Sequence, residues 1–159
     1  MAVTKNYQIE VTSSCSAFWT SVAGNWTIQT FSPNSFASVV GNVVTVSAYT
    51  RNGLDLSGIG EADNGLFVGN PVQTNQFQCT LTVVPIAITN IGPVGQIAIT
   101  VTDFASPAVY LNYTGLPGAP IVLNFTIPVG ARPVVGIQAA VQTPNNGFDS
   151  QVAYQVTLG

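Results

Sequence analysis

Segments in which apolar and polar residues alternate with a period of two recur along most of this chain. The segment 121–127 reads IVLNFTI, so four large apolar side chains share one strand face while Val122, Asn124 and Thr126 share the other. Alternation of this kind is typical of a half-buried β-strand, and no window shows a convincing helical period of 3.6 residues. The sequence therefore predicts an all-β protein.

Turn residues divide the alternating pattern into nine or so short segments. The predicted strands are residues 7–11, 18–31, 36–50, 77–89, 96–102, 108–113, 121–127, 134–142 and 151–158. Residues 18–31 form either one long strand or a hairpin bent near Gly24-Asn25. Pro85 predicts a bulge or an edge position, and Asn146-Gly147 suits a tight hairpin turn. We expect one domain over residues 1–159, a β-sandwich or barrel of about 8–10 antiparallel strands, with a jelly roll preferred over an immunoglobulin-like topology.

Residues 51–74 break the pattern, because they carry five glycines together with Asp55, Glu61 and Asp63. The segment is too long and too rich in glycine for a simple turn, so we expect a long surface loop there. A solvated crossover between two sheets is the simplest role for such a loop.

Charged residues make up 6% of the chain, against about 25% in ordinary globular proteins. The basic residues are Lys5, Arg51 and Arg132, and three scattered cations cannot neutralise the phosphates of a nucleic acid or anchor the chain electrostatically to a membrane. Pro and Gly interrupt the longest charge-free stretch, so we also expect no membrane insertion. The N-terminus runs directly into strand alternation, without the basic and apolar regions of a secretory signal.

The residue types needed for catalysis are scarce. There is no His, and Lys5, near the terminus, is the one amine that could activate a nucleophile. The six carboxylates match what any soluble surface needs, so we predict that the protein is not an enzyme and holds neither a cofactor nor a metal.

Two cysteines, Cys15 and Cys79, leave two alternatives open. They either form one disulfide, or remain two buried thiols that pack as small apolar side chains. Two distant cysteines without His make no zinc site.

The predicted sheets lack the charges that usually protect exposed strand edges from pairing with other chains. Either the proline residues protect the edges, or neighbouring subunits cover them. We therefore expect the protein to associate with itself as a dimer or larger assembly, with possible strand exchange through the N-terminal residues 2–12.

The start at Met1, the nine or so short strands, the scarce charges and the abundance of Thr, Asn, Val, Gly and Pro together resemble the single jelly-roll capsid proteins of tailless icosahedral viruses, including viruses of hot environments. The resemblance implies a structural protein of the virion that contacts other coat proteins. It carries no functional residue over to this chain.

Two alternatives to a capsid subunit remain. One is an extracellular filament or adhesin subunit at the cell surface, joined to its neighbours by strand exchange. The other is a carbohydrate-binding β-sandwich module, which would need a planar row of exposed aromatic side chains. The candidates for that row are Trp19, Trp26, Tyr49, Tyr110 and Tyr113.

Overall fold

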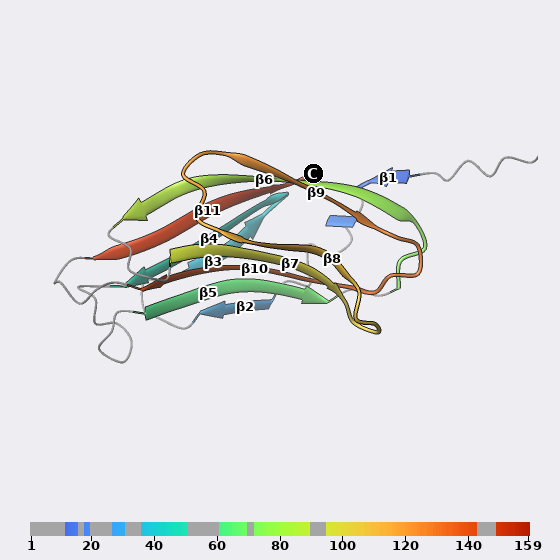
Figure 1. Cartoon of the computed structure of the whole chain (residues 1–159), viewed down its shortest axis with the longest axis horizontal. Coiled ribbons are helices and arrows are strands. Elements are labelled where there is room, and N and C mark those ends of the chain that lie inside the picture. The colour runs from blue at the N-terminus through green and yellow to red at the C-terminus, as the bar shows by residue number, and fades with distance from the viewer. Residues whose placement is uncertain are drawn as a thin grey trace, which may run out of the picture.

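The computed structural model describes part of the chain, namely residues 12–15, 18–19, 27–30, 36–50, 61–69, 72–89, 95–142 and 149–159. These residues form eleven β-strands in two sheets that pack face to face (Figure 1). The predicted all-β sandwich of jelly-roll type is confirmed. No helix in the described part is long and apolar enough to cross a membrane.

The six-stranded sheet has the order β1-β6-β11-β4-β3, with β9 paired to β6. Its strands are β1 (Thr12–Ser14), β3 (Phe36–Val40), β4 (Val43–Thr50), β6 (Gln76–Thr89), β9 (Ile121–Ile127) and β11 (Ser150–Leu158). β1 and β9 both pair with Phe77 and Gln78 of β6, so they lie on opposite edges of that strand. β1 is parallel to β6, whereas every other pairing in this sheet is antiparallel.

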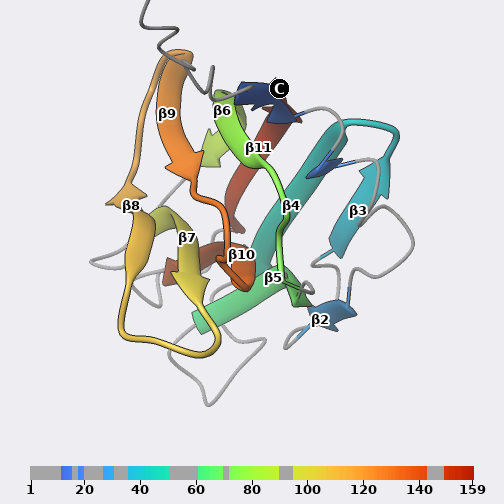
Figure 2. The same cartoon turned by 90° about the vertical axis from the view of Figure 1, so that its right-hand side faces the viewer.

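The five-stranded sheet has the order β2-β5-β10-β7-β8 and is antiparallel throughout. Its strands are β2 (Thr27–Thr30), β5 (Glu61–Gly69), β7 (Gly95–Asp103), β8 (Val109–Gly115) and β10 (Pro133–Gln142). Figure 2 looks at the sandwich from one end and shows the two sheets as separate layers.

The core lies between the sheets and consists of the inward-facing residues of both. Val44 and Val46 of β4, Leu81 of β6 and Ile137 of β10 are fully buried there. Tyr154 of β11 is also fully buried, and its hydroxyl donates a hydrogen bond to the carbonyl oxygen of Pro117 at 2.7 Å. Burial and desolvation raise the pKa of Tyr154 to about 12, so the side chain stays neutral at physiological pH.

Part of the predicted 51–74 loop is strand, which corrects the sequence-based expectation. Residues 61–69 form β5 and pair with β10 over nine positions. This ladder satisfies the backbone of a segment whose glycines give it a weak intrinsic preference for strand, so tertiary pairing overrides local propensity. Residues 51–60 lie outside the described residues, as does the predicted Asn146-Gly147 turn.

The predicted strand 36–50 is a hairpin of two strands. β3 and β4 meet at a two-residue turn, Gly41-Asn42, where Gly41 adopts a φ of 61°. A positive φ at this place is what a tight hairpin turn requires. The bulge predicted at Pro85 is present, because the register of β6 against β11 shifts there and leaves Ile86 exposed.

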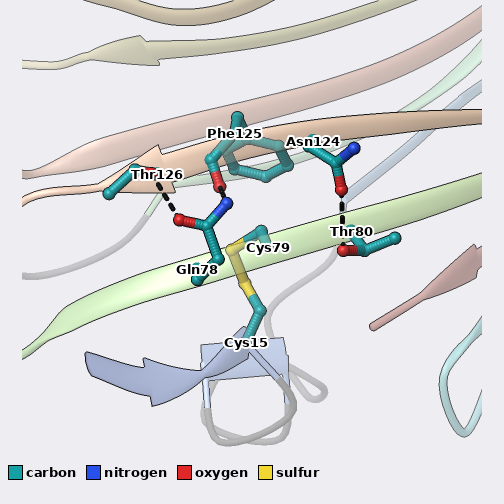
Figure 3. Close-up of a disulfide and its surroundings, with 7 residues drawn as sticks. All are labelled: Cys15, Gln78, Cys79, Thr80, Asn124, Phe125 and Thr126. Atoms are coloured by element: carbon teal, nitrogen blue, oxygen red, sulfur yellow. Dashed lines mark hydrogen bonds between the residues drawn. A yellow bond between two sulfur atoms is a disulfide. The ribbon is translucent and has the colours of Figure 1, made fainter. Parts of the chain in front are cut away.

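A disulfide joins Cys15 to Cys79, whose Cα atoms lie 4.8 Å apart (Figure 3). The bridge ties the segment that follows β1 to the core face of β6. Phe18 and Trp19 lie in the same region, where Phe18 packs against Phe77 and Trp19 packs edge-on against Phe125. We call these four aromatic residues the aromatic cluster. The predicted strand exchange through residues 2–12 falls almost wholly outside the described residues.

Candidate functional site

The outward face of the six-stranded sheet carries no charged side chain among the strand residues that the structure describes. Strand alternation places the following residues on this face: Phe36, Ser38 and Val40; Val43, Thr45, Ser47 and Tyr49; Gln151, Ala153, Gln155 and Thr157; Gln78, Thr80, Thr82 and Val84; Val122, Asn124 and Thr126. Hydroxyl and amide groups make up most of its polar atoms. Such a face suits a neutral polar ligand better than a charged one.

Cross-strand hydrogen bonds order the polar groups of this face. Thr80 Oγ1 donates to Asn124 Oδ1 at 2.9 Å, and Thr126 Oγ1 donates to Gln78 Oε1 at 2.8 Å (Figure 3). Gln78 Nε2 also reaches the carbonyl oxygen of Phe125 at 3.4 Å. These pairs fix the side-chain rotamers of β6 and β9, so this part of the face is rigid and largely satisfied internally.

Aromatic rings lie at one corner of the same face. Phe36 on the edge strand β3 is 49% exposed, and it pairs with Ser47, two residues before Tyr49. The two rings are therefore diagonal neighbours on adjacent strands, a spacing within reach of large side chains. Tyr49 pairs in turn with Gln151 of β11.

Polar groups surround these rings. The Tyr49 hydroxyl donates to Asp149 Oδ2 at 2.5 Å, and Gln151 Nε2 donates to Ser47 Oγ at 2.9 Å. Gln155, opposite Thr45, is exposed. We call Phe36, Tyr49, Asp149, Gln151 and Gln155 the sheet patch. An exposed ring beside carboxylate and amide oxygens can stack on the apolar face of a sugar while the polar groups bind its hydroxyls.

A second group of interacting residues lies at one end of the sandwich, on the right in Figure 1. We call residues 72–75, 103–109 and 128–132 the loop end. Asp103 organises it, because its carboxylate accepts hydrogen bonds from the Ala105 amide at 2.8 Å, the Tyr110 hydroxyl at 2.6 Å and the Arg132 amide at 3.1 Å. The Arg132 guanidinium stacks on the Phe104 ring, 4.3 Å from its centroid.

The hydrogen bond from Tyr110, followed by those from the Arg132 and Ala105 amides, lowers the pKa of Asp103 to about 2. Desolvation, with the Asp103 carboxylate nearby, raises the pKa of Tyr110 to about 12. The pair therefore stays as carboxylate and neutral phenol over the whole physiological range. Its role here is to hold the loops together.

The acid dependence of stability should reveal this network. Because the pKa of Asp103 is depressed in the folded state, its stabilising effect is present above the ordinary value near 3.8 and is lost as the pH falls toward about 2. We expect Asp103→Asn to lower the urea midpoint at about pH 6, and the difference from the wild type to shrink on acidification to about pH 2. A difference that stays constant over this range would contradict the assigned role.

The aromatic residues predicted as a sugar-binding row do not form one in the described part of the chain. Trp19 is 4% exposed and lies in the aromatic cluster, because its large ring fills the core beside the disulfide. Tyr110 of β8 donates a hydrogen bond to Asp103 of the loop end, and the Tyr113 ring packs over Gly115 toward the core. Tyr49 alone of the described four lies in the sheet patch, and Trp26 lies outside the described residues.

Two phenylalanines that the sequence did not single out are the exposed aromatic residues of the described chain. Phe36 is 49% exposed and Phe104 is 67% exposed. The described residues contain no group of three or more acidic, Cys or His side chains placed to hold a metal ion.

No family model matches this chain, and no curated protein matches it. Among solved structures it is similar to a carbohydrate-binding module of the β-sandwich superfamily, at 13% identity and a TM-score of 0.44, with 84% of this chain and 55% of that chain covered. It thus spans about half the length of that protein. The likeness concerns the fold.

Two further solved structures are similar to this chain. The K1 cleaved adhesin domain of Lys-gingipain from Porphyromonas gingivalis W83 is 16% identical, with a TM-score of 0.40 and coverage of 85% of this chain and 82% of that chain. TmCBM61, solved with β-1,4-galactotriose, is 10% identical, with a TM-score of 0.36 and coverage of 86% and 88%.

The predicted capsid function and virion location are wrong by this comparison. The similar structures named above are carbohydrate-binding sandwiches and an adhesin domain, and none of them is a capsid protein. The prediction depended on short strands and scarce charges, which are properties of a fold and a surface and do not by themselves identify a function.

Proposed function

We propose that the protein is a non-catalytic, extracellular binding module that binds a neutral carbohydrate through the sheet patch. The observation that carries the proposal is the exposed Phe36 ring, placed beside the Tyr49–Asp149 pair on a sheet face without charged strand residues. A pyranose presents an apolar face of C–H groups and a rim of hydroxyls. The sheet patch offers a matching ring and matching hydrogen-bonding groups.

The hydrogen bonds of the sheet patch support this role, because they orient the groups before any ligand arrives. Tyr49 holds Asp149 in place, and Ser47 holds the Gln151 amide. Sites that are already ordered lose less side-chain entropy on binding.

The Cys15–Cys79 disulfide supports the extracellular part of the proposal. Structural disulfides persist in oxidising compartments and are rare where glutathione and thioredoxin keep thiols reduced. A module that works outside the cell would keep the bridge throughout its lifetime.

Binding of neutral oligosaccharides tests the proposal directly. We expect binding on a glycan array, followed by titration calorimetry with the best ligand, and we expect Phe36→Ala to weaken the affinity roughly tenfold because it removes the stacking ring. Phe104→Ala is the matched control: it removes an equally large exposed ring from the loop end and should leave the affinity unchanged. Absence of binding to any neutral glycan, or an equal loss in both variants, would overturn the proposal.

A further inference from the structure

Exposed apolar side chains gather at the loop end. Val72, Phe104, Val109 and Val129 are 59%, 67%, 58% and 64% exposed. They come from three loops that hydrogen bonds join into one surface: Phe104 N donates to Arg132 O at 2.8 Å, and Gly130 N donates to Gln73 O at 2.8 Å. Exposed Pro107 and Pro128 extend the apolar surface. Concentrated apolar surface of this kind marks an interaction site.

Hydrogen bonds within the loop end satisfy several of its backbone groups. Asp103 N donates to Ala108 O, Ala131 N to Pro128 O, and Gln73 N to Ala131 O. Side chains bind two more amides, because Ala105 N donates to Asp103 Oδ1 and Ala108 N donates to Ser106 Oγ. The two prolines have no N–H group to satisfy. Removing irregular backbone from water is costly because its polar groups lose their partners, and these hydrogen bonds lower that cost for the groups that they join.

The two charged residues of the loop end, Asp103 and Arg132, are compatible with contact to a partner surface that has an apolar interior and phosphate groups outside it. Asp103 is occupied by three donors that belong to the loops. Arg132 is exposed, and its guanidinium lies against the Phe104 ring. An arginine in that position can reach headgroup phosphates while the ring beside it enters the acyl boundary.

From these observations we propose that the loop end docks on the surface of a phospholipid bilayer, with Phe104 and Val129 entering the interface and Arg132 at the headgroups. We choose a bilayer over a protein partner because the exposed apolar side chains are accompanied by Arg132, whose guanidinium lies against the Phe104 ring, and this pairing suits an apolar layer bordered by phosphates. Four such side chains give an anchor comparable to a single short lipid chain, so binding should be weak and reversible. The inference is independent of the carbohydrate proposal.

The sequence argued against two ways of binding a membrane, namely insertion of a spanning segment and electrostatic anchoring by a cluster of cations. The proposed docking is a third way. Neither is needed for shallow insertion of loop residues. Because one cation is involved, the partition coefficient should depend little on salt.

Co-sedimentation with sucrose-loaded phosphatidylcholine vesicles tests the proposal on the full, disulfide-bonded chain. We expect the wild type to sediment with the vesicles, with less than about a twofold change in partition coefficient between about 0.1 and 0.5 M NaCl. The double variant Phe104→Ser/Val129→Ser should lower the coefficient about tenfold or more. The matched control Val40→Ser/Val122→Ser removes exposed side chains, 75% and 57% exposed, from the six-stranded sheet and should change it less than about twofold.

Tryptophan fluorescence can identify which part of the protein contacts the vesicles. Phe104→Trp should show a blue shift of tryptophan emission when vesicles are added, while Val40→Trp should not. The proposal is overturned if the wild type does not sediment, if both serine variants lose binding equally, or if the Phe104-dependent contact proves to be self-association measured by light scattering without vesicles. Oligosaccharide titrations on the same variants are read separately, so failure of one proposal leaves the other intact.

Discussion

Loss of the Cys15–Cys79 disulfide should lower the free energy of unfolding by about 4 kcal/mol. The two cysteines are 64 residues apart in sequence, so the bridge closes a long loop in the unfolded chain and removes much of its conformational entropy. Without the bridge, this entropy returns to the unfolded state and stabilises it. In a protein whose total stability is about 5–15 kcal/mol, a loss of this size is severe.

Urea unfolding of the wild type with and without a phosphine reductant, beside the double variant Cys15→Ala/Cys79→Ala, measures the effect. Alanine is the appropriate replacement because both cysteines are fully buried and serine would add unsatisfied hydroxyls. The reduced wild type separates loss of the bridge from loss of sulfur packing. A change below about 1 kcal/mol in both experiments would show that the bridge does not constrain the unfolded chain as this model requires.

Phe18→Ala should cost about 3–5 kcal/mol, the usual range for removing a large aromatic side chain from a core. Phe18 is fully buried, and the centroid of its ring lies 4.9 Å from that of Trp19 and 5.7 Å from that of Phe77. Its loss leaves a cavity next to the disulfide, where the bridge restricts relaxation. Phe104→Ala serves as the control and should change the free energy of unfolding by no more than about 0.5 kcal/mol, because that ring is exposed.

The two effects should not add. Cys15 and Phe18 both fasten the segment after β1 to β6, so once the bridge is gone, the remaining contacts of that segment contribute less. A double-mutant cycle on unfolding free energies should therefore show that Phe18→Ala costs less in the Cys15→Ala/Cys79→Ala background. Simple additivity would mean that the segment stays docked without its disulfide.

Strand alternation was enough to predict most of the fold. β9 occupies the predicted residues 121–127, and β7, β10 and β11 differ from prediction by one residue at an end or at both ends. These strands each have one face on the core, which is the condition under which a period of two is visible in sequence. β5 was missed because its residues, rich in glycine, carry little pattern of their own and depend on β10 for pairing.

The candidate site was much harder to predict, because the register of each strand decides which aromatic residues are exposed. The alternating pattern predicted one continuous strand over residues 36–50 and missed the hairpin turn at Gly41-Asn42. That turn aligns Phe36 with Ser47 and so places the Phe36 ring on the outward face of the sheet. The prediction that named Trp19 as a candidate for an exposed aromatic row was wrong, because its ring is buried in the core. Nothing in its local sequence indicates that the disulfide region draws it into the core.

The capsid resemblance shows the limit of composition as evidence for function. Few charges, short strands and many Thr and Asn residues follow from building a sandwich whose surface is polar but neutral. They say little about what that surface meets. Function depends on which side chains lie next to one another, as in the sheet patch, and composition does not record that arrangement.

The order of strands in the six-stranded sheet has a consequence for synthesis. β11 lies between β4 and β6, which pair with it on either side and not with each other. A ribosome therefore releases five strands of this sheet, together with the whole five-stranded sheet, before the strand that joins them emerges. The nascent chain therefore exposes the unpaired edges of β4 and β6 until Ser150–Leu158 emerges, and we expect the six-stranded sheet to close only after that point.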